Sequence, residues 1–274
     1  MVTGMRGDHA RSALAGTRFG HLRWVAETGS TNRDLLDLAA AAAPDGTVLV
    51  ADHQTSGRGR LDRSWHAPPG GSLLVSVLFR LGLPVADSHL LTTAVGVSAV
   101  EACRNLTPVA AHLKWPNDVV VDLGGSGVRK LGGILAESTV EGDEVAGIVV
   151  GLGLNVAWPP EIPSELADVA VALNHLTGGA GPDREDLLIE LLLRLDRWVD
   201  QALDRSGQGR RALMDRAREL SATLGQSVRV DLGREQVVGR AVELTDEGEL
   251  IVQTTLEDRR VVVVGDVVHL RTAE

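Results

Sequence analysis

A loop rich in arginine and glycine follows an apolar segment near the start of the chain. The apolar residues 46–51 are typical of a β-strand, and residues 57–63 then hold Gly57, Arg58, Gly59, Arg60 and Arg63. Arginine offers fixed N–H donors that match pairs of phosphate oxygens. Glycine lets backbone N–H groups approach an anion closely. This pattern constrains the fold, because the strand must end where the loop that follows it can close over a phosphate-bearing ligand.

The composition is that of a soluble globular protein. Hydrophobic residues make up 44% of the 274 positions, and no apolar run approaches the roughly 18–20 residues of a membrane helix. The first twenty residues contain no apolar segment typical of a signal peptide. The single cysteine, Cys103, excludes an internal disulfide and is typical of a reducing compartment. We therefore expect a cytoplasmic protein with no membrane partner.

The charge of the chain argues against nucleic acid as a partner. Its formal net charge is −10, whereas DNA-binding domains usually carry a basic stripe. Residues 1–20 are polar and irregular and are too short for a helix-turn-helix module. We expect them to form a flexible tail.

The periodicity of the apolar residues predicts a large domain followed by a small one, with the boundary at residues 222/223. In the large domain, residues 21–222, the pattern predicts a strand at 24–26, and residues 155–182 are expected to be a loop with one short helical piece. The other predicted strands are 47–52, 72–80, 112–115, 119–121, 130–139 and 146–154, and the predicted helices are 33–43, 87–105, 183–203 and 209–222. In residues 223–274 the predicted strands are 228–230, 236–243, 250–254, 259–264 and 267–270, a number typical of a small barrel.

Four clusters beside the arginine loop are candidates for chemistry. In the segment 29–32, Gly-Ser-Thr-Asn, the hydroxyls of Ser30 and Thr31 can meet a polar ligand, although capping of the next helix is the simpler interpretation. Residues 114–118, Lys-Trp-Pro-Asn-Asp, taken alone favour a surface turn. Gly132 and Gly133 lie within a predicted strand, where a ligand contact and a plain bulge are equally good explanations. Residues 151–155 add two more glycines and an asparagine at a strand end.

Several common site patterns are missing from the sequence. It contains no P-loop, and its Gly-x-Gly is not followed by the helix of a dinucleotide fingerprint. The histidines show no paired metal-ligand spacing, and no Gly-x-Ser-x-Gly elbow occurs.

Taken together, these clusters resemble the biotin–protein ligases, the enzymes that attach biotin to carboxyl-carrier proteins. The matching segments are 30–32, 54–60 with Trp65, 114–118, 129–137 and 151–155, in the order found in the family. The resemblance covers about residues 22–270. Because the chain lacks the N-terminal DNA-binding domain of the regulatory members, it is similar to the short, ligase-only members.

The resemblance implies a fold and a two-step reaction. The fold class would be α/β (α+β), a mixed sheet with flanking helices as in class II aminoacyl-tRNA synthetases, followed by an SH3-like barrel. Biotin and ATP would give biotinyl-5′-AMP, with Mg²⁺ neutralising the pyrophosphate. A lysine on the carrier domain of acetyl-CoA carboxylase or a related carboxylase would then attack the anhydride. The family also implies a monomer or a weak homodimer.

The resemblance further assigns residues to roles, with Lys130 between the biotin carboxylate and the α-phosphate. Asp118 would favour a neutral carrier lysine, or would instead orient Mg²⁺ or Lys114. The implied catalytic residues are Lys130, Arg60, Asp118 and Lys114. The implied biotin-binding residues are Ser30, Thr31, Asn32, Gln54, Gly57, Arg58, Gly59, Arg60, Lys130, Gly132, Gly133, Leu135 and Gly153. The implied nucleotide-binding residues are Arg58, Arg60, Arg63, Trp65, Asn117, Lys130 and Asn155, and no metal ligand is indicated.

The biotinyl-5′-AMP intermediate of this reaction needs protection from water. Closure of the loop of residues 55–70 over the adenylate would exclude water, so we expect this loop to be open or disordered until a ligand binds.

Two alternative functions remain open. A lipoate–protein ligase shares the fold and the two-step logic, and a non-catalytic biotin- or nucleotide-binding module is a second alternative. The Gly-Arg-Gly-Arg and Lys-Trp-Pro-Asn-Asp segments favour biotin, and the presence of Lys130 with the loop arginines favours catalysis.

Overall fold

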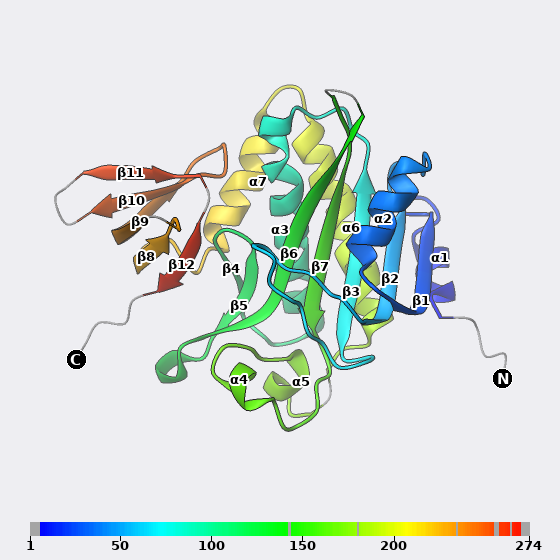
Figure 1. Ribbon diagram of the computed structural model, residues 1–274, viewed down its shortest axis with the longest axis horizontal. Helices are drawn as coiled ribbons and strands as arrows, with labels where there is room; N and C mark the ends of the chain where they lie inside the picture. The colour runs from blue at the N-terminus through cyan, green and yellow to red at the C-terminus, as the bar shows by residue number, and fades with distance from the viewer. Residues whose placement is uncertain are drawn as a thin grey trace.

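A seven-stranded sheet forms the centre of the computed structural model, which describes residues 6–141, 144–179, 181–233, 235–254, 258–263 and 265–269 (Figure 1). The strand order is β1-β2-β3-β7-β6-β5-β4. β1 and β2 run parallel, and the other neighbouring pairs are antiparallel, so the sheet is mixed as predicted. The strands are β1 (Leu22–Thr28), β2 (Val48–Gln54), β3 (Ser72–Phe79), β4 (Ala111–Lys114), β5 (Asp118–Asp122), β6 (Val128–Glu141) and β7 (Glu144–Asn155).

Helices cover the two faces of this sheet unequally. The larger core includes residues from five helices, and the helix Thr31–Ala40 covers part of the other face through Leu35 and Ala39. The helices are α1 (Asp8–Ala13), α2 (Thr31–Ala40), α3 (His89–Leu106), α4 (Ser164–Ala167), α5 (Leu173–Leu176), α6 (Arg184–Leu203) and α7 (Gln208–Glu219), with short 3₁₀ turns at Val85–Asp87 and Gly124–Ser126. Among the described residues, no helix is both long enough and apolar enough to cross a membrane.

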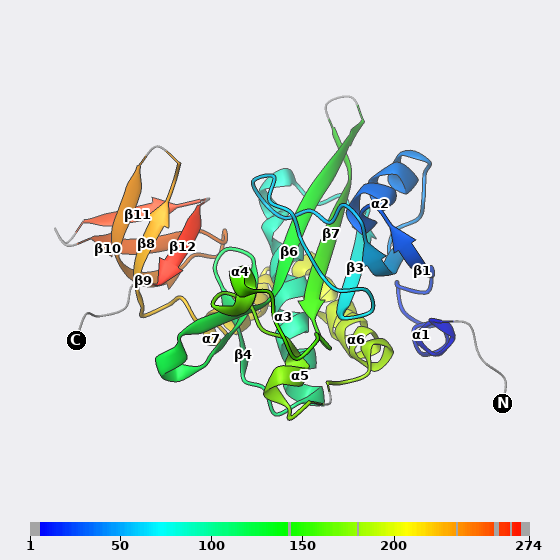
Figure 2. The same cartoon turned by 60° about the horizontal axis from the view of Figure 1, so that its bottom comes forward.

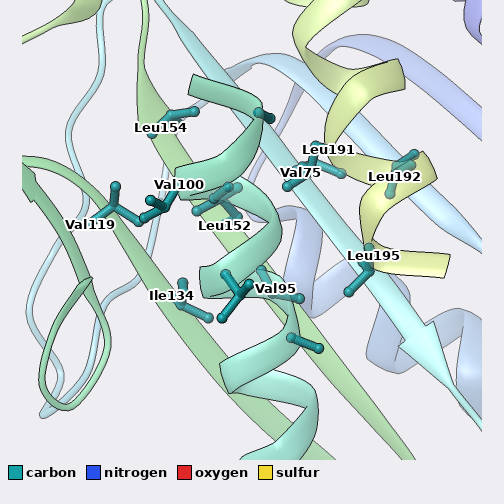
Figure 3. Packing of buried hydrophobic residues seen from close by; sticks show 14 of the residues in the cluster. Val75, Val95, Val100, Val119, Ile134, Leu152, Leu154, Leu191, Leu192 and Leu195 are labelled. Atoms are coloured by element: carbon teal, nitrogen blue, oxygen red, sulfur yellow. The ribbon is translucent and has the colours of Figure 1, made fainter. Parts of the chain in front are cut away.

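The alternation of side chains along β7 explains why the two faces differ. Successive residues of a strand point to opposite faces. Leu152 and Leu154 are buried in the core with α3 and α6 (Figure 3). Gly151 and Gly153 therefore point to the other face, which bears α2 and the arginine loop. Since glycine has no side chain, other groups can pack directly against the backbone of β7 on this face.

The N-terminal segment is an integral part of the large domain. Ala10, Leu14 and Phe19 are each 0% exposed, and the backbone N–H of Ala10 donates to Glu185 Oε1 at 2.8 Å. The expectation of a flexible tail is therefore wrong over residues 6–20, while residues 1–5 lie outside the described part of the chain. The apolar residues are scattered among polar ones, so their local composition does not reveal that α1 packs against α6.

Residues 155–182 also differ from the expectation, because two short helices, α4 and α5, are present instead of one helical piece. This segment returns to the sheet at Lys130, whose N–H donates to the carbonyl of Val169 at 2.8 Å. The carbonyl of Lys130 in turn accepts from the N–H of Val171 at 2.9 Å. The backbone of Lys130 is thus held by a connection that local sequence does not predict.

The C-terminal strands form a second, antiparallel sheet around a small core of its own. The order is β11-β10-β9-β8-β12, and Val228, Val230 and Val252 are fully buried within it. The strands are β8 (Ser227–Asp231), β9 (Gln236–Leu244), β10 (Leu250–Thr254), β11 (Arg259–Val262) and β12 (Asp266–His269), close to the predicted ranges, of which residues 264 and 270 lie outside the described part. The arrangement is that of a small barrel-like domain.

The small domain stands beside β4 and α7 at one end of the main sheet (Figure 2). Trp115, which follows β4, connects the two domains. Its backbone N–H donates to Thr223 Oγ1 and its indole N–H to the carbonyl of Gly248, both at 3.0 Å. The Lys-Trp-Pro-Asn-Asp segment is therefore a domain junction as well as a turn.

We predict that Phe19→Ala lowers the free energy of unfolding of the large domain by about 3 kcal/mol, because it empties a fully buried site. Chemical denaturation followed by circular dichroism would measure the change. Val263→Ala, at a position 71% exposed, is the control and should leave the free energy within about 0.5 kcal/mol. Equal stability of wild type and Phe19→Ala would restore the interpretation as a flexible tail.

Candidate active site

A cavity of about 260 Å³ opens between the start of α2, the arginine loop and the glycine-bearing face of the sheet. Helix α4 and the segment after it close one side through Leu166, Val169 and Ala170. The sequence-predicted site residues that line this cavity are Ser30, Thr31, Asn32, Gln54, Arg58, Gly59, Arg60, Arg63, Trp65, Asn117, Asp118, Lys130, Gly133, Leu135, Gly153 and Asn155. Residues from separate parts of the chain, predicted on sequence grounds to act together, thus surround one space.

Three predicted residues do not line this cavity. A Cβ atom at Gly57 would lie 2.5 Å from the carbonyl oxygen of Trp65, so this glycine allows the loop to fold on itself. A Cβ atom at Gly132 would lie 2.8 Å from the carbonyl oxygen of Gly153, so this glycine allows a close approach of β6 and β7. Lys114 lines a neighbouring cavity of about 270 Å³, which shares Arg60, Asn117 and Asp118 with the first.

A polar network connects the start of α2 to the end of β2. Ser30 is the N-cap residue but makes no side-chain capping bond. Instead Gln54 Oε1 accepts the N–H of Thr31 at 2.7 Å and the Thr31 hydroxyl at 2.9 Å. Ser76 Oγ lies 2.7 Å from Thr31 Oγ1 and 2.6 Å from Asn32 Oδ1. Gln54 thus performs the capping in place of Ser30, which lines the cavity.

The arginine loop is folded rather than open. The N–H of Gly59 donates to the carbonyl of Arg63 at 2.7 Å, and the N–H of Trp65 donates to the carbonyl of Gly57 at 2.9 Å. These bonds make a compact hairpin that crosses the sheet (Figure 1). The expectation of an open or disordered loop differs from this arrangement, because contacts within the chain itself hold the loop down.

Trp65 is the main apolar contact between the loop and the sheet. Its indole lies over the glycines: an added Cβ atom would come within 2.5 Å of the ring at Gly153 and 3.1 Å at Gly133. Trp65 thus packs against both glycines, and the contact of biotin with Gly133 and Gly153 stays a prediction. The buried indole N–H has no hydrogen-bond partner among the described residues. An unpaired buried donor is costly and indicates that a ligand acceptor belongs nearby.

Each loop arginine meets a different partner. Arg58 reaches Glu137, with N–O distances of 2.6 and 2.7 Å to the two carboxylate oxygens. Arg63 pairs with Asp266 of the C-terminal domain. Arg60 donates to the amide oxygen of Asn117 at 3.1 Å. Arg58 and Arg63 are therefore charge-compensated, whereas the partner of Arg60 is neutral.

Lys130 and Asp118 form an ion pair at the cavity, with Nζ 2.6 Å from Oδ1. The ammonium also lies 5.5 Å from the centre of the Trp65 ring, within the range of a cation–π contact. Burial lowers the pKa of Lys114, and the charge of Lys130 adds to this effect while Asp118 and Asp266 oppose it. The Asp118 carboxylate thus pairs with the Lys130 ammonium, and Asp118 is also the strand partner of Lys114.

Asn155 has a structural role that accounts for its position. It is 1% exposed, and its amide N–H donates to the carbonyl of Val171 at 3.1 Å. This bond ties the segment after β7 back to the strand end. A nucleotide contact by Asn155 stays a prediction.

Sequence reasoning missed four groups in or beside the cavity, of which Ser76 and Glu137 do not line it but contact residues that do. Ser76 was hidden in an apolar strand, although it pairs in register with Gly151. Glu137 was noted only as part of a motif, Asp266 lies 203 positions after Arg63, and the apolar residues after α4 carry no signal. One usable signal was overlooked: Lys114 and Lys130 are the only lysines in the chain, which otherwise uses arginine.

The cavity does not contain a ready-made metal site. Within the described residues, no cluster of three or more His, Cys, Asp or Glu side chains is arranged to hold a metal ion. The carboxylates of Asp118, Glu137 and Asp266 each face a cation of the protein.

Comparisons with known proteins agree with this geometry. The Biotin/lipoate A/B protein ligase family model matches residues 24–155, and the Biotin protein ligase C terminal domain model matches residues 223–270. The biotin–[acetyl-CoA-carboxylase] ligase of Mycobacterium tuberculosis is 41% identical, over 94% of this chain and 92% of that protein. The bifunctional ligase/repressor of Bacillus subtilis is 30% identical, over 85% of this chain and 70% of that protein.

The solved structures lead to the same family. The biotin protein ligase from Aquifex aeolicus, in complex with biotin and ATP, superposes with a TM-score of 0.76 at 30% identity, covering 93% of this chain and all of that one. Sequence models, a near full-length relative and the fold thus converge: this chain belongs to the biotin protein ligase family.

Proposed function

We propose that this chain is an ATP-dependent biotin–protein ligase, which activates biotin to biotinyl-5′-AMP and transfers it to a lysine of a carboxylase carrier domain. One observation carries the proposal: a single cavity combines two cations, Lys130 and Arg60, with the polar network around Thr31. The near full-length similarity to a biotin–[acetyl-CoA-carboxylase] ligase supports the choice of carrier. The similar structure with biotin and ATP supports the two substrates.

The first step joins two anions. An oxygen of the biotin carboxylate attacks the α-phosphorus, a new P–O bond forms, and the bond to the β-phosphate oxygen breaks to release pyrophosphate. Positive charge and orientation lower this barrier. Lys130 supplies a compact ammonium for the two reacting anions. Arg60 is our choice for the main phosphate ligand among the loop arginines, because its observed partner is an amide rather than a carboxylate. Magnesium on the ATP phosphates would neutralise the departing pyrophosphate.

The second step requires a neutral amine. The carrier lysine attacks the anhydride carbonyl, a C–N bond forms, and the bond to the phosphate oxygen breaks to release AMP. A lysine with its ordinary pKa of about 10.4 is mostly protonated at neutral pH, so a proton acceptor is needed. Asp118 is the proposed acceptor, because it lies beside Lys130 and borders both cavities. Its ion pair with Lys130 keeps the carboxylate in place.

The apolar and polar parts of the cavity suit biotin. Such sites place a few polar groups in an apolar wall. We assign the ureido edge to Ser30, Thr31 and Gln54, and the adenine side to Trp65. The neighbouring apolar surface of Leu166 and Val169 completes the wall.

Biotin-dependent exchange of pyrophosphate into ATP tests the function directly. We expect exchange with biotin and at least about 100-fold less with lipoate, followed by transfer of biotin to a carrier domain. Lipoate lacks the ureido group of biotin and has a different ring, so a site shaped for biotin should discriminate against lipoate by about this factor. Exchange with lipoate alone would identify a lipoate ligase, and tight binding of biotin without exchange would identify a binding module.

Lys130→Ala should lower the single-turnover rate of biotinyl-AMP formation by about 10³-fold, because the reacting anions lose their nearest ammonium. Binding of biotin, measured by calorimetry, should weaken by no more than about tenfold. Lys130→Arg keeps the charge and should retain more activity than Lys130→Ala. Adenylate formation by Lys130→Ala at the wild-type rate would remove Lys130 from its role.

Gly153→Ala tests the seat of Trp65. The added methyl would lie 2.5 Å from the indole and displace it, so the KM for ATP should rise about tenfold or more, by the usual cost of overpacking. Gly125→Ala is the matched control, because a Cβ atom there meets nothing within 4 Å. An unchanged KM for ATP in Gly153→Ala would separate Trp65 from the nucleotide.

A further inference from the structure

The carboxylate of Glu137 is the meeting point of the arginine loop and the start of α2. It lies on β6 with its side chain 23% exposed. Arg58 contacts both of its oxygens, and Asn32 Nδ2 donates to Oε2 at 2.9 Å. The neighbouring carbonyl of Leu135 accepts from the same amide group at 3.1 Å. Glu137 therefore joins two segments that both line the cavity, the arginine loop through Arg58 and the start of α2 through Asn32.

These contacts continue into a closed ring of polar groups. Asn32 Oδ1 receives the hydroxyl of Ser76, which lies beside Thr31, and Thr31 contacts Gln54 at the end of β2. Gln54 directly precedes the arginine loop, and Arg58 lies within it. The loop is thus attached at its start through Gln54 and further along through Arg58. Glu137 supplies the only negative charge among these ring members.

We infer that Glu137 is a positioning residue, which holds the arginine loop closed over the cavity by binding Arg58 and Asn32. The inference rests on the proposed function and extends it to the control of the intermediate. Arg58 serves this closure instead of binding phosphate, since its guanidinium is already paired with a carboxylate. Charge-assisted bonds of this kind are stronger than neutral ones.

The charge of Glu137 also connects loop closure with the binding of anions. An uncompensated carboxylate next to the cavity repels biotin, ATP and the adenylate. When the loop closes, Arg58 neutralises that charge at the same time as Arg60 approaches the site. A closed loop therefore presents a more favourable field to the adenylate than an open one does.

Trypsin measures the opening of this loop without reference to activity, because it cleaves after Arg60 and Arg63. Glu137→Gln keeps the size and one acceptor but removes the charge, so cleavage at these two arginines should be about tenfold faster than in wild type. Release of biotinyl-AMP should accelerate by a similar factor. The single-turnover rate of adenylation at saturating biotin should stay within about threefold, so that KM rises while kcat changes little.

Two controls separate positioning from general destabilisation. Glu243→Gln removes an exposed acid that is paired with Arg259 on the C-terminal domain and should change none of these rates. Arg58→Gln breaks the same contact from the loop side, where the side chain is 42% exposed, and decides the matter if Glu137→Gln does not fold. The double variant should be no faster in loop cleavage than either single variant.

The outcomes distinguish this inference from the proposed function. Wild-type rates of loop cleavage and adenylate release in both single variants would overturn the inference, as would additive effects in the double variant. A wild-type protein without biotin-dependent exchange would overturn the proposed function, while the cleavage rates would still judge the role of Glu137.

Discussion

The site depends on holding several cations close together by means of carboxylates placed between them. Lys130 faces Asp118, Arg58 faces Glu137 and Arg63 faces Asp266. Without these acids the mutual repulsion of the cations would open the loop, and with too many of them the site would repel its anionic substrates. Arg60, whose partner is the neutral amide of Asn117, leaves the cluster with unbalanced positive charge at one place. A chain with a net charge of −10 thus creates a local site for phosphate.

The alternation of leucine and glycine along β7 determines how the segments that carry these charges pack on the sheet. Leucines at 152 and 154 anchor the strand to the helices, and glycines at 151 and 153 leave space on the opposite face. Asn32 and Ser76 occupy the space at Gly151, and Trp65 occupies the space at Gly153. These four consecutive residues of β7 therefore stabilise the core and form the floor of the site. Larger side chains at either glycine would force the loop or α2 away from the sheet.

Local patterns were sufficient to predict most strands and the long helices, and the family resemblance of the motifs predicted most residues of the cavity. Apolar periodicity located α6, and the glycine and arginine clusters located the loop, because these signals lie within a few neighbouring residues. Contacts between distant segments were not predictable in this way. Phe19 is buried in a core that distant segments of the chain form, and Arg63 pairs with Asp266 in another domain. The role of Glu137 likewise depends on a loop 79 positions earlier in the chain.

The position of Arg58 in the complex with the intermediate tests the central claim most directly. A crystal structure of the protein with biotinyl-5′-AMP would show both the phosphate and the loop. Our account predicts that Arg60 and Lys130 contact the phosphate oxygens while Arg58 remains on Glu137. An Arg58 guanidinium that leaves Glu137 and binds the phosphate would contradict it.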